Sequence, residues 1–175
     1  MAFILAEHRA SGEEVVANFQ RYREYLNANQ SRFPPRAYEL ASAEWYFDPN
    51  DHRCPHDAWL EAVTIEEPAA GKRREERTVA IRTRLLGAYH DGYLEFHYPR
   101  VFEYSLNLKD GVRGHRDWLY DEFRLSPEGH VVHEIQWSGP RETGRWMIKA
   151  SDVELVWRPN SSDSRLTSAS SWRRA

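Results

Sequence analysis

The spacing of apolar residues changes once along this chain, from a helical repeat to a strand repeat. Residues 11–30 carry apolar side chains three and four positions apart, which predicts an amphipathic helix. Ser11 and Glu14 have the spacing of a capping box at its start, and Pro35 predicts that it has ended. Downstream of this proline, apolar and polar residues alternate, which is typical of strands that bury one face.

The alternating part of the chain predicts roughly seven to nine short strands joined by turns. Asp91-Gly92, with β-forming residues on both sides, predicts a two-residue hairpin turn, and Pro99 predicts a bulge or a break. The segments that alternate are 39–47, 59–65, 79–85, 93–98, 102–108, 119–125, 131–137 and 146–157.

We therefore predict a mainly β fold with one N-terminal helix, in which an antiparallel meander closes as a small barrel. A β-sandwich is the alternative, since either arrangement protects the edges of a sheet. The length of 175 residues suits one helix-plus-β domain, which we place at 1–158. Residues 159–175 are rich in serine and poor in large apolar side chains, so we predict a disordered tail there.

The charge balance and the single cysteine restrict the function classes. Lys and Arg number 24 against 27 Asp and Glu, without the basic excess of a nucleic-acid binder, so we expect no nucleic-acid partner. Cys54 is the only cysteine, which fits a reducing compartment, and no apolar run reaches the ~20 residues of a membrane span. We expect a cytoplasmic protein without a membrane partner. Phosphate-loop, nucleophile-elbow and zinc-protease motifs do not occur in the sequence.

Aromatic residues are abundant, with 7 Trp, 9 Tyr and 7 Phe. Most of the tryptophans fall on alternating apolar faces, which predicts a bulky β core rather than a binding surface. Trp118 and Tyr120 instead fall on the face opposite Leu119 and Phe123. We predict that these two rings contact a ligand.

His52, Cys54 and His56 occupy alternate positions of one proline-containing loop. In an extended loop the three side chains would point to one side, and imidazole and thiolate are good ligands for zinc and similar ions. A divalent metal at this loop is the one cofactor that the sequence suggests. The spacing matches no standard zinc pattern, so a polar surface loop is the alternative.

Tyr93, Glu95 and His97 share one face of the strand that follows the Asp91-Gly92 turn. If that face lines the inside of a barrel, the three side chains form a polar ligand site within an aromatic shell. If the opposite face is the core, they face solvent instead.

Three ionisable residues fall on faces that otherwise look apolar: His133, Asp121 and Glu61. Burying such groups without partners costs several kcal/mol, so they should pair with each other or line a cavity. A histidine beside carboxylates in apolar surroundings suits general acid–base catalysis. The alternative is a hydrogen-bonded core histidine with carboxylates at strand ends.

Together these features favour a binding module, in which an aromatic-rich β-barrel holds a small molecule or a protein partner. One alternative is a metal-assisted or acid–base hydrolase that uses the His, Asp and Glu residues named above. A further alternative is an accessory or immunity-type protein that acts through surface complementarity. The sequence leaves the identity of the ligand and the oligomeric state open.

Overall fold

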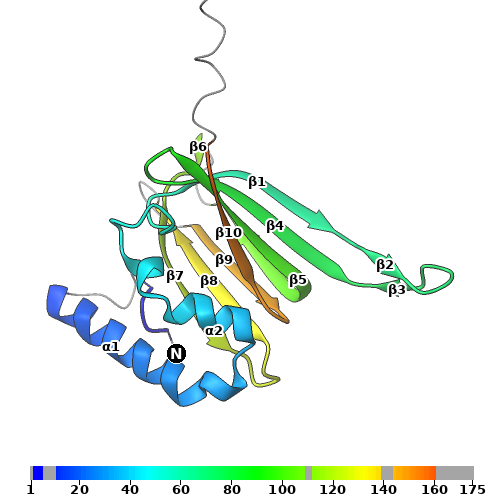
Figure 1. The fold of residues 1–175 in the computed structure, drawn as a ribbon, viewed down its shortest axis with the longest axis horizontal. Helices are drawn as coiled ribbons and strands as arrows, with labels where there is room; N and C mark the ends of the chain where they lie inside the picture. The colour runs from blue at the N-terminus through cyan, green and yellow to red at the C-terminus, as the bar shows by residue number, and fades with distance from the viewer. Residues whose placement is uncertain (1, 6–10, 109–111, 139–143, 161–175) are drawn as a thin grey trace, which may run out of the picture.

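The computed structural model describes residues 2–5, 11–108, 112–138 and 144–160. Its helical elements are α1 (Gly12–Asn29), η2 (Gln30–Arg32), α2 (Pro35–Ser42) and η3 (Glu44–Phe47), of which η2 and η3 are 3₁₀ turns. Its strands are β1 (Trp59–Glu66), β2 (Ala69–Ala70), β3 (Glu76–Arg77), β4 (Val79–Leu86), β5 (Gly92–Asn107), β6 (Val112–His115), β7 (Trp118–Leu125), β8 (Val131–Trp137), β9 (Gly144–Ala150) and β10 (Glu154–Pro159) (Figure 1).

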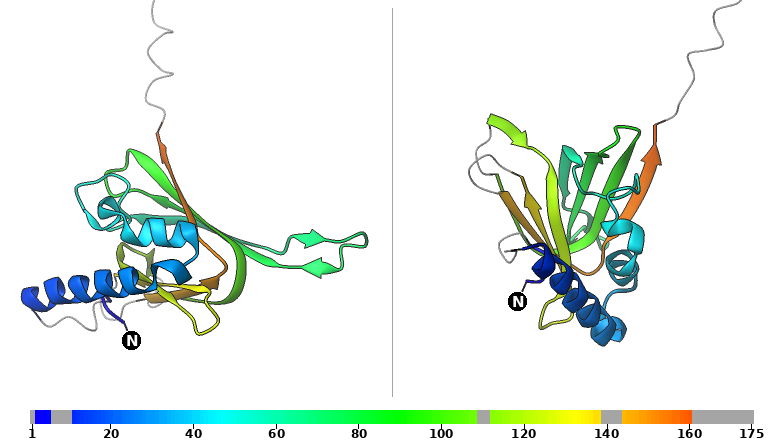
Figure 2. Two further views of the ribbon diagram at one scale, coloured as in Figure 1. Left: turned by 60° about the horizontal axis from the view of Figure 1, so that its bottom comes forward. Right: turned by 90° about the vertical axis from the view of Figure 1, so that its left-hand side faces the viewer.

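One antiparallel sheet of seven strands dominates the fold, in the order β1-β4-β5-β9-β8-β7, with β10 also paired to β5. The long strand β5 runs through Pro99 and changes its partner there, from β10 at residues 92–97 to β9 at residues 101–107. The two halves of the sheet that share β5 splay apart, and the helices lie near the end where the halves converge (Figure 2). The prediction of a mainly β, antiparallel fold with an N-terminal helix is confirmed.

Closure into a barrel is not established by these strands. The two outer strands of the main order are β1 and β7, and one isolated bridge joins Trp59 of β1 to Asp117, the residue before β7. Hydrogen bonds between Ala58 and Trp118 and between Asp57 and Trp118 support this bridge. Because the described strands form no continuous ring of ladder hydrogen bonds, the barrel remains a prediction.

The core lies between the two halves of the sheet and the helices. Alternate residues of β4, β5, β8 and β9 face inward and are fully buried, and α1 and α2 cover them with one apolar stripe each. The largest of these side chains are Trp118, Trp137, Trp146, Tyr22, Tyr46, Tyr98, Phe96 and Phe123. As the sequence predicted, aromatic rings make up much of the buried volume.

Helix α1 begins as predicted and covers the outer edge of β7. The Ser11 side chain accepts a hydrogen bond from the Glu14 backbone N–H at 3.3 Å. Tyr22 Oη accepts from the Phe123 N–H at 2.8 Å and donates to the Phe123 carbonyl at 3.1 Å, and Tyr25 Oη accepts from the Leu125 N–H. These hydroxyls form hydrogen bonds with backbone groups of β7 that would have no partner at an uncovered sheet edge.

The prediction of a strand over residues 39–47 is wrong. The segment forms α2 and η3 instead. Pro35 lies in the first turn of α2, where its missing N–H costs nothing, and Ala37, Leu40 and Ala41 are buried at helical spacing. Alanine at several positions made the segment compatible with both periods, so the alternation carried little information.

The turn before β5 is also longer than predicted. The chain reverses over residues 87–91, with His90 in the left-handed region at φ 58°, and Tyr93 pairs with Leu86. Gly92 belongs to β5 itself. A Cβ on Gly92 would lie 2.4 Å from the Trp157 ring of β10, so glycine is needed here for close packing rather than for a turn.

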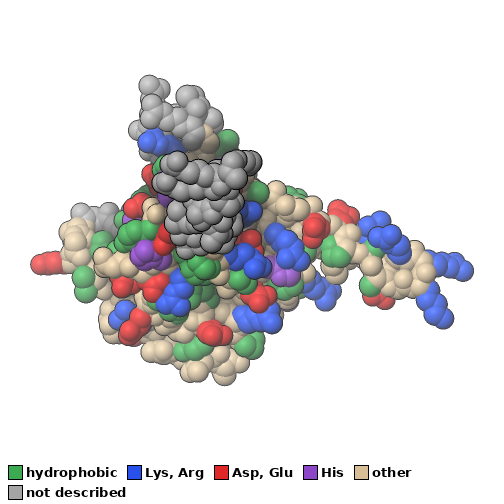
Figure 3. Space-filling model, turned by 45° about the horizontal axis from the view of Figure 1, so that its top comes forward, with side chains coloured by type: hydrophobic (Ala, Val, Ile, Leu, Met, Phe, Trp, Pro, Cys, Tyr) green, Lys and Arg blue, Asp and Glu red, His purple; other side chains and the backbone are tan. Residues whose placement is uncertain are grey.

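One hairpin arm extends beyond the body of the fold. Strands β2 and β3 prolong the β1–β4 hairpin into an arm, and Lys and Arg side chains gather at its tip (Figures 1 and 3). Strand β10 ends at Pro159, and the N–H of the next residue, Asn160, donates to the Asp91 carbonyl at 2.7 Å. Residues 159 and 160 of the tail predicted over 159–175 are therefore held in the fold, and 161–175 lie outside the described residues.

Candidate functional site

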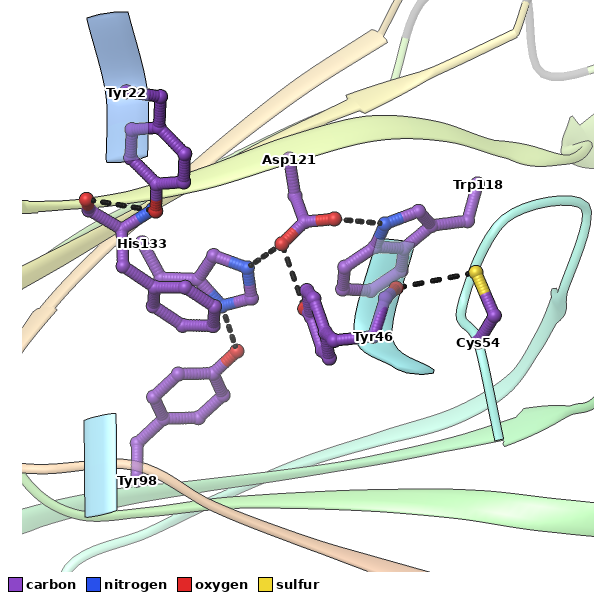
Figure 4. A network of polar contacts seen from close by, with 8 residues as sticks. Tyr22, Tyr46, Cys54, Tyr98, Trp118, Asp121 and His133 are labelled. Atoms are coloured by element: carbon purple, nitrogen blue, oxygen red, sulfur yellow. Dashed lines mark hydrogen bonds and ion pairs between the residues drawn. The ribbon is translucent and has the colours of Figure 1, made fainter. Parts of the chain in front are cut away.

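A buried hydrogen-bond network centred on Asp121 joins β5, β7, β8 and η3 (Figure 4). The Asp121 carboxylate accepts hydrogen bonds from Tyr46 Oη at 2.6 Å, from Trp118 Nε1 at 2.9 Å and from His133 Nε2 at 2.9 Å. The other ring nitrogen of His133 lies 2.7 Å from Tyr98 Oη. All five side chains are at most 4% exposed.

One proton assignment satisfies every member of this network. Tyr98 donates to Nδ1 of His133, and the Nε2–H of His133 donates to Asp121, which is then an ionised carboxylate with three neutral donors. Burial raises the pKa of Tyr46 and of Tyr98 well above the usual value, and the charge of Asp121 raises both further. Both phenols therefore stay protonated and can donate.

The structure places Trp118 on the same side of β7 as Phe123, whereas the sequence pattern placed it on the opposite face. The pairing of β7 with β8 shifts between Trp118 and Tyr120, and this bulge turns the Trp118 ring to the same side as Asp121 and Phe123. The ring is 1% exposed and stacks on Phe96 with centroids 5.2 Å apart. Strict alternation, which placed Trp118 on a polar face, does not hold across a bulge.

A pocket of about 250 Å³ opens beside Asp121, and we call it the Asp121 pocket. It lies between α1, η3, the loop before β1, the first residues of β7 and the N-terminal segment. Most of its wall is apolar or aromatic, and the polar groups converge around Asp121. The lining residues are Ile4, Val15, Phe19, Tyr46, Phe47, Pro49, Cys54, Pro55, His56, Trp118, Leu119, Tyr120 and Asp121.

The Asp121 pocket brings together residues from three separate predictions. Cys54 and His56 come from the proposed metal loop, Trp118 and Tyr120 from the proposed ligand-binding rings, and Asp121 from the proposed acid–base set. His133 lies behind Asp121, fully buried, with both ring nitrogens in contact with network members. This matches the core-histidine alternative better than the catalytic one, since His133 does not line the pocket.

The proposed metal ligands do not converge. His52 contacts the Asp91 carboxylate and stacks on Tyr89 at 4.1 Å, whereas His56 Nδ1 lies 2.6 Å from the Leu119 carbonyl. The Cys54 thiol donates to the Tyr46 carbonyl at 3.1 Å. Within the described ranges, no group of three or more His, Cys, Asp and Glu side chains is placed to hold a metal ion.

Burial raises the pKa of the Cys54 thiol to about 12. Because the thiolate is the reactive form, we expect iodoacetamide to alkylate Cys54 at pH 8 much more slowly in the native protein than in guanidinium chloride, by a factor of about 100 or more. Mass spectrometry of timed samples measures this directly, since the chain has no other cysteine. Equal rates in the two states would show that the thiol is open to solvent.

A second carboxylate anchors the N-terminal segment to β7. Glu122 is 0% exposed, and its Oε2 accepts from the backbone N–H groups of Phe3 at 2.8 Å and Ile4 at 2.7 Å. Its other oxygen lies 3.0 Å from Arg124 Nε, an ion-pair contact without hydrogen-bond geometry. Glu122 thereby holds Ile4 in the wall of the Asp121 pocket.

The remaining predicted residues lie on the outer face of the sheet. Leu94, Phe96 and Tyr98 are the inward residues of β5, so Glu95 and His97 face outward, as the solvent-face alternative required. They line a groove of about 450 Å³ across β1, β4, β5 and β10. Burial, and then the nearby Arg82, lowers the pKa of His97.

The charges of this outer face are paired with each other. Glu61 is exposed and lies 3.3 Å from Arg84, so the prediction that Glu61 lies on an apolar face is wrong. The Arg84 guanidinium also covers the Tyr93 ring, at 3.8 Å from the ring centroid. Arg158 contacts Glu95, Arg36 contacts Glu154, and Arg82 lies 3.7 Å from Glu66. Figure 3 shows basic and acidic side chains interspersed over the surface.

Two tyrosines of the site escaped prediction because nothing in the pattern marks either of them. Tyr46 fell inside the wrongly predicted strand, and Tyr98 looked like a core residue of the next one. No local signal distinguishes a tyrosine whose hydroxyl completes a buried network. The nearest clue was the presence of ionisable residues, Asp121 and His133, on core faces.

In comparisons with known proteins, no protein-family model, curated protein or solved structure matches this chain. Among the described helices, none has the length and apolar character needed to cross a membrane. The function must therefore be argued from the site itself.

Proposed function

We propose that this protein is a binding module that holds a small, largely apolar molecule in the Asp121 pocket. The observation that carries the proposal is an apolar pocket of about 250 Å³ that converges on a buried carboxylate. Apolar walls with a few fixed polar groups are typical of small-molecule sites. The three donors that hold Asp121 keep it in one orientation, which favours selective binding.

Two further observations favour binding over catalysis. The thiol of Cys54 is protonated at neutral pH, so it is a weak nucleophile, and the His133 imidazole does not reach the pocket. The outer groove is the weaker candidate for a ligand, because its arginines already contact glutamates of the same face. Exposed pairs of this kind contribute little energy and suit a solvated surface.

The test measures the binding of benzyl alcohol and benzylamine by protein NMR, in the wild type and in a variant with a narrowed pocket. We expect saturable shift changes at the amides of Ile4 and Leu119 in the wild type. Val15→Phe should abolish them by filling the pocket. Val16→Phe is the matched control, because Val16 is the next residue on α1, is 71% exposed and does not line the pocket.

The proposal is contradicted if neither compound gives saturable shifts at these residues, or if both bind Val15→Phe as well as they bind the wild type. Far-UV circular dichroism shows whether each variant is folded. If Val15→Phe does not fold, Leu119→Phe narrows the same pocket from β7 and replaces it.

A further inference from the structure

We infer that the ligand of the Asp121 pocket is a small organic amine, whose ammonium group pairs with Asp121 while its apolar part fills the pocket. This inference rests on the proposed function and adds the chemical class of the ligand. It follows from the charge of the pocket, from the free acceptor capacity of Asp121 and from the aromatic wall.

The charge of the pocket is negative at its floor. Among the described residues that line the pocket, Asp121 is the one acidic residue, and none is a Lys or an Arg. In the proton assignment above, its three donors are a phenol, an indole and a neutral imidazole, which stabilise the charge without neutralising it. A buried carboxylate without a counter-charge is costly, so a cation in the pocket relieves that cost.

Asp121 also has room for one more donor. Within the described ranges, its Oδ2 accepts from both Tyr46 and His133, whereas Oδ1 accepts from Trp118 alone. A carboxylate oxygen has two acceptor sites, so Oδ1 can take a further N–H. The other polar lining groups are weaker candidates to accept a hydrogen bond from a ligand, because the Cys54 thiol and His56 Nδ1 both contact backbone carbonyls.

The rings around Asp121 favour a cation over a neutral donor. Phe19, Phe47, Tyr46, Trp118 and Tyr120 all line the pocket. Aromatic faces attract ammonium groups through the ring quadrupole, and such contacts strengthen when water is excluded. An anionic ligand would meet the Asp121 charge, and the described part of the pocket wall holds no Lys or Arg to offset it.

The test compares three compounds that share one benzyl or phenyl ring and differ in charge. We expect benzylamine to bind the full-length protein at pH 7 at least tenfold more tightly than benzyl alcohol, and benzoate to show no saturable binding. The same NMR shifts at Ile4 and Leu119 report the site, and Val15→Phe should remove the binding of benzylamine.

Ionic strength separates pairing inside the pocket from attraction to surface carboxylates. Exposed charge pairs are screened at high salt, whereas pairs shielded from water are screened much less. We therefore expect the tenfold preference to persist in 0.5 M NaCl, which corresponds to a Debye length of roughly 4 Å. Loss of the preference at high salt would overturn the inference.

Each other outcome is also decisive. If benzyl alcohol binds as tightly as benzylamine at these residues, the pocket is a ligand site but the amine inference is wrong. If benzoate binds best, the inference is wrong as well. If none of the three compounds binds there, both the inference and the proposed function fail.

Discussion

Replacing Asp121 by alanine is expected to lower the free energy of unfolding by about 3–5 kcal/mol. The substitution leaves three buried donors, from Tyr46, Trp118 and His133, without an acceptor. A donor buried without a partner costs about 1–3 kcal/mol, so the three together account for the size of the effect. Chemical denaturation in urea, followed by tryptophan fluorescence and circular dichroism, measures the change.

Tyr46→Phe is the graded control for Asp121→Ala. It removes one hydroxyl and leaves Asp121 with the hydrogen bonds from Trp118 and His133, so we expect a loss of only about 1–2 kcal/mol. If Asp121→Ala costs no more than Tyr46→Phe, the network contributes little to stability. The role of Asp121 would then be ligand binding in the pocket and not stabilisation of the fold.

Replacing Glu122 by alanine should destabilise the fold by a similar amount, about 3–5 kcal/mol. The change removes the acceptor of the Phe3 and Ile4 N–H groups and leaves Arg124 with one acidic partner fewer. Because Ile4 is part of the pocket wall, benzylamine binding should weaken together with stability. Urea denaturation and hydrogen exchange at Ile4 and Leu5 report the two effects.

Glu122→Gln separates the two roles of this carboxylate. The glutamine oxygen can still accept from Phe3 and Ile4, since both donate to the same oxygen of Glu122, whereas the charge opposite Arg124 is lost. We expect slow exchange at Ile4 to be retained with a smaller loss of stability, about 1–3 kcal/mol. Fast exchange at Ile4 in Glu122→Gln would show that the ion pair, and not the backbone contacts, holds the segment.

Residue types alone predicted part of the candidate site. Five of the residues that the sequence singled out line one pocket, because ionisable and aromatic residues on core faces must find partners or a cavity. The grouping of those five residues was different from the predicted one. Cys54 and His56 meet Asp121 rather than His52, since the loop that carries them folds over the start of β7.

Local sequence patterns were enough to predict the helix that Ser11 caps, the antiparallel strands and the inward face of β5. These properties follow from side-chain spacing and capping, which act within a few residues. Long-range packing instead set the helical state of residues 35–47, the inward turn of Trp118 at a bulge, and the partners of Asp121. Such features depend on contacts between distant segments, whose energies exceed local preferences and leave no trace in the local pattern.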